Sequence, residues 1–267
     1  MTPINERKSI PKVPLIDQLN QADSSLLKSY QAKVLGNDSF SALLRYELLI
    51  FFLNNLSGGA GYLLRKRFYP SLFKQVGGSV IFGKGIGLRH PGQINLGARV
   101  AVDDYVLLDA SGAGEKGIDI GDDVIISRNS VIQGKTGPVA IGSKTDIGCN
   151  TIISSCAGIS IGSSVLIGGN CYIGGAHYIA DRLDVPMMEQ GTYSKGPVVI
   201  EDGVWLGAGA TVLDGVQVGK GCIVGAGAIV TKSLPDYAVA VGVPAKVIKY
   251  RKDDVRGQPK AAPDFRL

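Results

Sequence analysis

Histidine is the side chain best suited to proton transfer near neutral pH, and this chain contains only two histidines, His90 and His177. His177 follows Gly174-Gly175-Ala176 and lies in a segment, roughly residues 175–197, that interrupts an otherwise regular repeat. Long segments that leave a regular scaffold are often functional. His90 is followed by a proline and a glycine, which indicate a corner, so we expect a structural role for it. His177 is therefore the candidate general base.

A general base usually has a hydrogen-bond partner on its second ring nitrogen. Asp181, Asp184 and Glu189 lie in the same segment and are candidates for this partner, although each is equally well explained as a solvated loop charge. The four cysteines (Cys149, Cys156, Cys171, Cys222) show no CxxC spacing, so we expect no metal site. Cys171 and Cys222 occupy small inward positions of the repeat, which favours core packing.

The elements that must position His177 follow from a repeat of six residues. Between Leu96 and Val230 an aliphatic residue returns at every sixth position, in six groups of three, and all extra residues lie between groups. The eighteen positions are Leu96, Val102, Leu108; Ile120, Ile126, Ile132; Ile141, Ile147, Ile153; Ile161, Ile167, Ile173; Ile200, Leu206, Val212; Val218, Val224, Val230. A period of six fits neither a helix nor simple alternation, and it is the signature of a β-solenoid with three faces per coil.

Each group of six residues would form one short strand and one corner, with its aliphatic residue pointing inward. Successive coils then stack at about 4.8 Å, so that the inward residues form apolar columns and the backbones pair between coils. We predict an all-β solenoid over residues 80–235, with an irregular first coil at Ile86, Leu88 and Ile94. A helical segment (1–79) precedes it, and a closing segment with a flexible tail (236–267) follows.

The N-terminal segment contains apolar runs with helical spacing at about residues 24–33, 39–56 and 62–73, and Ser39 or Ser41 could cap the second. These runs are too short and too charged to span a membrane. Either the helices cap the open end of the solenoid, or residues 43–73 lie at a membrane surface with Arg65-Lys66-Arg67 near the headgroups. The two interpretations are compatible.

Charge is distributed unevenly along the chain. Residues 1–79 carry ten basic and five acidic side chains, residues 80–235 carry eleven and fourteen, and residues 236–267 carry seven and four. A nucleic-acid-binding protein would carry its basic surface on the folded body, so we expect no nucleic-acid partner. The polar start of the chain has no apolar signal core, and we expect a cytoplasmic protein, at most peripheral at the inner face of the membrane.

The hexads, for example Ile161-Gly162-Ser163-Ser164-Val165-Leu166, resemble those of the hexapeptide-repeat acyltransferases. The segment from Val241 to Lys249 resembles the end of sugar and xenobiotic O-acetyltransferases in that family. This resemblance implies a left-handed parallel β-helix, a homotrimer, and direct acetyl transfer from acetyl-coenzyme A. The acceptor would be a hydroxyl of a sugar or glycan precursor, and His177 would be the base.

The resemblance also implies binding residues. Ala208 and Ala226 would line the pantetheine arm of the coenzyme, Thr231 and Lys232 would meet its nucleotide end, and Lys246 would meet its phosphates. Gly148 stands where galactoside and maltose acetyltransferases have an acceptor-binding asparagine, which leaves its neighbours as candidates. The candidate acceptor residues are Asp146, Asn150, Asp184 and Trp205, although Trp205 could equally pack against another subunit. Residues 181–186 resemble acetyltransferases of exopolysaccharide and lipopolysaccharide biosynthesis.

Three other functions fit parts of the pattern. A γ-class carbonic anhydrase needs three zinc-binding histidines, and the chain has two. N-acetylation of an amino sugar would use the same base and stays open. A non-catalytic solenoid that serves as a structural or binding module would need neither the 175–197 segment nor its histidine.

Overall fold

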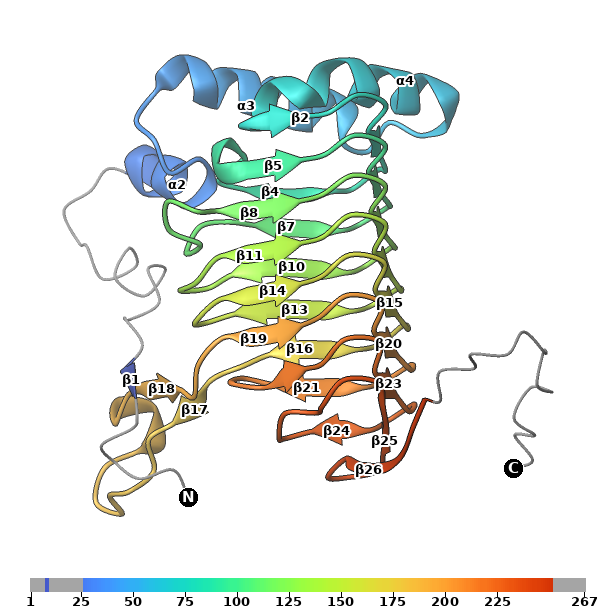
Figure 1. The fold of residues 1–267 in the computed structure, drawn as a ribbon. Coiled ribbons are helices and arrows are strands. Elements are labelled where there is room, and N and C mark those ends of the chain that lie inside the picture. Colours follow the sequence, from blue (N-terminus) through green and yellow to red (C-terminus); the bar gives the residue numbers. More distant parts are fainter. Residues whose placement is uncertain (1–7, 10–25, 252–267) are drawn as a thin grey trace, which may run out of the picture.

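The computed structural model describes residues 8–9 and 26–251, which form a triangular prism of stacked coils with helices over one end (Figure 1). Face one consists of β2 (Gln75–Val76), β5 (Ile94–Leu96), β8 (Ile118–Ile120), β11 (Val139–Ile141), β14 (Ile159–Ile161), β19 (Val198–Ile200) and β22 (Gln217–Val218). Face two consists of β3 (Ile81–Phe82), β6 (Ala101–Val102), β9 (Ile125–Ile126), β12 (Asp146–Ile147), β15 (Leu166–Ile167), β20 (Trp205–Leu206), β23 (Ile223–Val224) and β25 (Ala238–Val241). Face three consists of β4 (Gly87–Arg89), β7 (Leu107–Asp109), β10 (Val131–Gly134), β13 (Ile152–Ser155), β16 (Tyr172–Gly174), β21 (Thr211–Leu213) and β24 (Ile229–Val230).

Every strand within these faces pairs in parallel with the strand one coil away, and the antiparallel β26 (Lys246–Tyr250) closes face two. In Figure 1 the chain crosses the near face, returns across the far face and descends, which is a left-handed winding. The predicted solenoid of hexapeptide repeats is thus confirmed, and all eighteen repeat positions are buried.

The first coil differs from the prediction. An irregular coil was expected around Ile86, Leu88 and Ile94, but β2, β3 and β4 form a regular coil that begins at Gln75. Its inward residues are Val76, Phe82 and Leu88, six positions apart. The irregularity follows this coil, where a 3₁₀ turn, η3 (Pro91–Gln93), is inserted before face one resumes.

Small polar side chains inside the prism satisfy carbonyl groups at the corners. Ser130 Oγ donates to the carbonyl of Gly148 at 3.2 Å, and Thr151 Oγ1 donates to that of Gly168 at 3.2 Å. Cys171, which is 2% exposed, follows in the same column. Buried polar groups are costly unless they are bonded, so these columns stabilise the corners. The predicted core role of Cys171 and Cys222 is confirmed.

The corner between face two and face three, edge 2–3, requires a left-handed backbone residue in every coil. The residues with positive φ along it are Gly85, Tyr105, Asn129, Asn150, Asn170, Gly209 and Gly227. Asparagine tolerates this conformation better than most residues, and glycine adopts it without strain. Asparagine fills three successive middle coils, whereas glycine fills the last two.

Three helices precede the prism: α3 (Phe40–Leu53) and α4 (Gly58–Phe68) lie across its N-terminal end, and α2 (Leu26–Val34) lies beside the first coils (Figure 1). The 3₁₀ helix η2 (Tyr69–Leu72) follows α4. Ser39 caps α3, because its side chain accepts a hydrogen bond from the amide of Ala42 at 3.3 Å. Leu43 and Tyr46 of α3 join the prism core, so the helices form a cap. Among the described residues, no helix is both long and apolar enough to cross a membrane.

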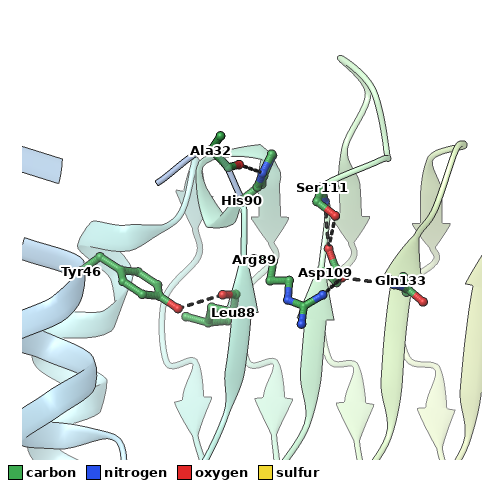
Figure 2. A network of polar contacts seen from close by, with 8 residues as sticks. All are labelled: Ala32, Tyr46, Leu88, Arg89, His90, Asp109, Ser111 and Gln133. Carbon is green, nitrogen blue, oxygen red and sulfur yellow. Dashed lines mark hydrogen bonds and ion pairs between the residues drawn. The ribbon is translucent and has the colours of Figure 1, made fainter. Parts of the chain in front are cut away.

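Polar contacts tie the cap to the first coil and that coil to the second (Figure 2). Tyr46 Oη donates to the carbonyl of Leu88 at 2.9 Å. His90 is buried, its ring lies 2.8 Å from the carbonyl of Ala32 in α2, and its amide donates to the carbonyl of Val34. On the neighbouring coils, Arg89 pairs with the fully buried Asp109 at 3.2 Å. The structural role expected for His90 agrees with these contacts.

A second anchor of the cap is Arg65 in α4, which is 4% exposed. Its Nε donates to the carbonyl of Phe82 in the first coil at 3.0 Å. Its Nη1 donates to the carbonyls of Leu53 and Leu56 at the end of α3, at 2.9 and 2.7 Å. One guanidinium group therefore joins α3, α4 and the prism, and its charge favours the negative end of the α3 dipole.

Replacement of Arg65 by methionine should loosen the cap selectively. Because three carbonyl groups would lose their donor, we expect the opening free energy of the cap to fall by about 2–4 kcal/mol, while the prism changes little. Hydrogen exchange measured along the chain would show faster exchange in α3 and α4 only. The matched control is Arg67→Met, which alters an exposed side chain two residues away. Equal protection in the two variants would contradict this role for Arg65.

Candidate active site

The predicted excursion leaves the prism after β16 and returns at β19, at the corner between face three and face one, edge 3–1. Within it, β17 (His177–Tyr178) pairs antiparallel with β18 (Thr192–Ser194), and a short 3₁₀ turn, η4 (Met187–Glu189), lies between them. The strand β1 (Lys8–Ser9) adds to the other side of β18. The loop that carries His177 is therefore a small three-stranded sheet, which restricts its position.

Two contacts orient the His177 side chain, which is 31% exposed. Its ring stacks on that of Tyr193, with centroids 5.2 Å apart and an angle of 24° between the planes. Its Nε2 lies 2.9 Å from Oδ1 of Asp214, whose side chain is 5% exposed. Asp214 is itself fixed, because Oδ2 accepts hydrogen bonds from Ser194 Oγ at 3.0 Å and from the amide of Lys195 at 2.7 Å.

The sequence did not point to this partner. Asp181, Asp184 and Glu189 were considered because they share the loop with His177, but the contact is made by Asp214, which follows β21 in the next coil. Asp184 instead pairs with Arg182 on the exposed part of the loop. A signal was available: Ile173 and Val212 are aligned repeat positions, so Asp214 lies one coil beyond Gly175, where the loop departs.

The arrangement defines which nitrogen can act as a base. A neutral imidazole has one protonated and one unprotonated nitrogen, and a carboxylate facing Nε2 favours the proton there. The unprotonated nitrogen is then Nδ1, which can accept a proton from an acceptor group. The charge of Asp214 stabilises the imidazolium that forms, so the pair can perform general-base chemistry.

The chain offers no activated thiol in this region. Burial raises the pKa of the Cys156 thiol above its ordinary value, and burial raises the pKa of the Cys171 and Cys222 thiols in the same direction. A raised pKa keeps a thiol protonated and a poor nucleophile. Cysteine chemistry at these three positions is thereby disfavoured.

A cavity of about 240 Å³ lies beside the loop, lined in part by Ser154, Cys156, Tyr172, Tyr178 and Thr192. The Ser154 hydroxyl is buried and has no hydrogen-bond partner in the described structure. Tyr178 and Thr192 form one pair of the β17–β18 ladder, whereas His177 and Tyr193 form the next pair. Successive strand residues point to opposite faces, so this cavity is on the other side of the small sheet from the imidazole.

The predicted coenzyme-binding residues lie elsewhere on the prism. Ala208 and Ala226 precede the left-handed glycines Gly209 and Gly227 on edge 2–3. Thr231 and Lys232 follow β24, and Lys246 is the exposed first residue of β26. The segment before Lys246 packs against β24, because the amide of Ala245 donates to the carbonyl of Ile229 at 2.8 Å.

The predicted acceptor residues are divided between two edges. Asp146 and Trp205 point outward from face two, two coils apart with Leu166 between them, and Asn150 lies at edge 2–3. Asp184 is in the loop at edge 3–1, with His177. A single chain therefore does not bring the candidate base together with the candidate coenzyme corner or with Asp146, Asn150 and Trp205.

A metal site finds no support in the part of the chain that the structure describes. Within residues 8–9 and 26–251, no three histidine, cysteine, aspartate or glutamate side chains lie close enough together to hold an ion.

The repeats are similar in sequence to those of known transferases. Residues 197–232 match the family described as bacterial transferase hexapeptide (six repeats). A probable acetyltransferase of Mycobacterium tuberculosis is 37% identical over 135 residues, which is 51% of this chain and 45% of that protein. The 2,3,4,5-tetrahydropyridine-2,6-dicarboxylate N-acetyltransferase of Thermotoga maritima is 56% identical over 73 residues, 27% of this chain and 31% of that enzyme.

Among solved structures, a point mutant of AntD, an N-acyltransferase from Bacillus cereus, in complex with dTDP and coenzyme A aligns with a TM-score of 0.47 and 24% identity. That alignment covers 74% of this chain and 92% of AntD. A galactoside acetyltransferase in complex with coenzyme A aligns with a TM-score of 0.41 and 18% identity, covering 86% and 93%. By its repeats and its curated relatives the chain resembles the hexapeptide-repeat acetyltransferases, although it spans less than half the length of those relatives.

The Asp214→Asn variant should change the tautomer of His177. The amide of Lys195 needs an acceptor, so the asparagine oxygen should face Lys195 and its NH₂ group should face the imidazole. Nε2 then becomes an acceptor and the proton moves to Nδ1. Nitrogen NMR shifts of the His177 ring would report this exchange. An unchanged tautomer in a folded variant would show that Asp214 does not set the protonation pattern.

Proposed function

We propose that this protein is an acetyltransferase that moves an acetyl group from acetyl-coenzyme A to a hydroxyl of a sugar or glycan precursor. The observation that carries the proposal is the His177–Asp214 pair, held on a three-stranded loop that leaves a prism of transferase-type hexapeptide repeats. The curated relatives, which are acetyltransferases, support the same class of reaction.

In the proposed reaction His177 Nδ1 takes the proton of the acceptor hydroxyl while the hydroxyl oxygen bonds to the thioester carbonyl carbon. The carbon–sulfur bond then breaks, and the coenzyme leaves as a thiol after it receives the proton from the imidazolium. Asp214 holds the ring and stabilises its transient positive charge. Transfer is direct, with both substrates bound together, so that orientation supplies much of the rate enhancement.

The glycines of edge 2–3 support a coenzyme groove along that corner. A Cβ atom at Gly227 would meet no protein atom within 4 Å, and at Gly209 it would meet only backbone at 3.8 Å or more. Asn129, Asn150 and Asn170 adopt the same left-handed conformation on earlier coils. The left-handed backbone itself favours glycine at these two positions, and the open space beside them would also let an extended ligand approach the backbone closely.

We also propose that the complete site forms between copies of this chain in a homotrimer. The base is at edge 3–1 and the groove is at edge 2–3, so a neighbouring prism must supply one of them. Face two offers an outward column that is apolar apart from Asp146, which suits burial against another copy. The column consists of Ile81, Ala101, Ile125, Asp146, Leu166, Trp205 and Ile223.

Transfer to an amine is the second candidate, because the Thermotoga relative is named as an N-acetyltransferase. The same base would remove a proton from an amine during attack. The nature of the product separates the two: an ester is cleaved by mild base, and an amide is not.

Replacement of His177 by alanine should lower turnover by about 10²–10⁴-fold with coenzyme affinity nearly unchanged, because only proton transfer is lost. The assay uses acetyl-coenzyme A with nucleotide sugars, oligosaccharides and amino sugars, and mass spectrometry detects the product. Leu183→Ala, a fully exposed position in the same loop, is the control and should keep wild-type turnover. A folded His177→Ala variant with full turnover would refute the assignment of the base.

Replacement of Gly227 by asparagine should raise the KM for acetyl-coenzyme A at least about tenfold while the fold is retained. Asparagine tolerates the left-handed backbone, but its side chain would occupy the proposed groove. Gly203→Asn is the matched control, since Gly203 has the same conformation and equally open surroundings on the corner between face one and face two. Equal KM values for the two variants would argue against a groove at edge 2–3.

Mixing the His177→Ala and Gly227→Asn chains tests whether copies share the site. If the loop of one copy meets the groove of the next, mixed trimers contain some sites with both elements intact, and activity at low acetyl-coenzyme A concentration rises above that of either variant alone. If each chain carried a complete site, mixing would restore nothing.

A further inference from the structure

The cap helix α3 is apolar on both of its sides. Its inner side packs on the prism through Leu43 and Tyr46. Its outer side exposes residues at helical spacing, which are Phe40 (67%), Leu44 (50%), Leu48 (48%) and Phe51 (80%), with Phe52 (63%) beside them. A helix that is hydrophobic all round is normally covered on all sides. Only two side chains of α3 are charged, Arg45 and Glu47, and the described residues leave its outer apolar side uncovered.

The surface around this helix is basic. The exposed basic side chains of the cap region are Lys28, Lys33, Arg45, Lys66, Arg67 and Lys74, against one exposed acidic side chain, Asp38, and the half-buried Glu47. Glu47 accepts a hydrogen bond from Tyr30 at 2.6 Å. In α4, Leu63 is 63% exposed beside Lys66 and Arg67. Large apolar side chains thus share one end of the molecule with an excess of positive charge.

We propose that this end of the prism docks on an anionic lipid surface. Because α3 and α4 lie across the end of the prism (Figure 1), both can lie in the plane of a membrane interface. The exposed Phe and Leu side chains would enter the acyl boundary while the basic side chains meet the headgroups. No described helix can cross a membrane, so attachment is peripheral. The prism axis would then point away from the surface.

Charge favours a lipid surface over a second copy of this chain. Two caps placed end to end would bring two basic clusters together, and like charges across an interface oppose association. Anionic headgroups instead attract each basic side chain. This inference does not depend on the proposed acetyl transfer, because it concerns the opposite part of the chain from His177 and is measured without activity.

Flotation of the full chain with lipid vesicles tests the proposal. We expect binding to vesicles of phosphatidylcholine and phosphatidylglycerol in equal amounts, and at least about tenfold weaker binding to phosphatidylcholine alone. Phe51→Ser combined with Phe52→Ser should lower binding to the anionic vesicles about tenfold or more. Ile248→Ser, which changes an exposed apolar side chain (59%) at the far end of the prism, should bind as the wild type does.

The charge contribution has its own control. The double variant Lys66→Glu with Arg67→Glu should lower binding to anionic vesicles about tenfold or more. The control, Lys116→Glu with Lys144→Glu, changes the net charge by the same amount on the side of the prism and should bind as the wild type does. The Phe51→Trp variant reports directly whether this side chain enters the lipid. The fluorescence of the tryptophan introduced at position 51 should be quenched by brominated lipids, whereas the fluorescence of the natural Trp205 on face two should not be quenched.

Absence of flotation with anionic vesicles would overturn the proposal. So would equal loss of binding in the cap and prism charge variants, which would indicate attraction by net charge alone. Concentration-dependent pairing of oligomers that Phe51→Ser with Phe52→Ser abolishes, without vesicle binding, would assign the surface to a second copy instead.

Discussion

Hydrogen bonding between successive coils is the interaction on which the rest of this structure depends. Each strand of the three faces is only two to four residues long and, apart from β25, which pairs with β26, has no partner within its own coil, so a coil is stable only against its neighbours. Pairing in exact register stacks the inward aliphatic residues, and it also aligns the corners. The positions of the other features follow from this register. The His177 loop departs at edge 3–1, the left-handed glycines lie along edge 2–3, and the helical cap closes the first coil.

The register explains what the sequence revealed about the fold. The ladder of aliphatic residues identifies inward positions directly, because nothing else repeats every six residues with corners between. The same spacing is present in Val76, Phe82 and Leu88, whereas the expected irregular coil rests on Ile86, Leu88 and Ile94, around the proline and glycine that follow His90. The helices can be predicted because their spacing is local, and a cap over the open end is one of the two placements that the sequence suggests. The contacts that hold the cap, such as those of Arg65, could not be predicted, because they join residues far apart in the sequence.

The candidate site, like the fold, could be predicted from the sequence only in part. His177 stands out in the sequence by its rarity and by the break in the repeat, but its partner Asp214 is 37 residues away and belongs to a different coil. Proximity along the chain favoured Asp181, Asp184 and Glu189, whereas proximity in a solenoid is set by the coil above or below. The hydrogen bonds that hold Asp214, from Ser194 and Lys195, could not be anticipated, because they depend on how the loop rejoins the prism.

The number of stacked coils sets the distance along the prism between the helical cap and the His177 loop. The His177 loop departs from the coil β14–β16, four coils beyond the capped coil β2–β4, and at one strand spacing per step this amounts to about 19 Å. Since every coil contacts only its neighbours, insertion or deletion of one whole coil would shift this height by about 4.8 Å and leave both ends chemically unchanged. A solenoid can thus adjust the distance between an anchoring end and a reacting end in discrete steps, which a globular core cannot do without repacking.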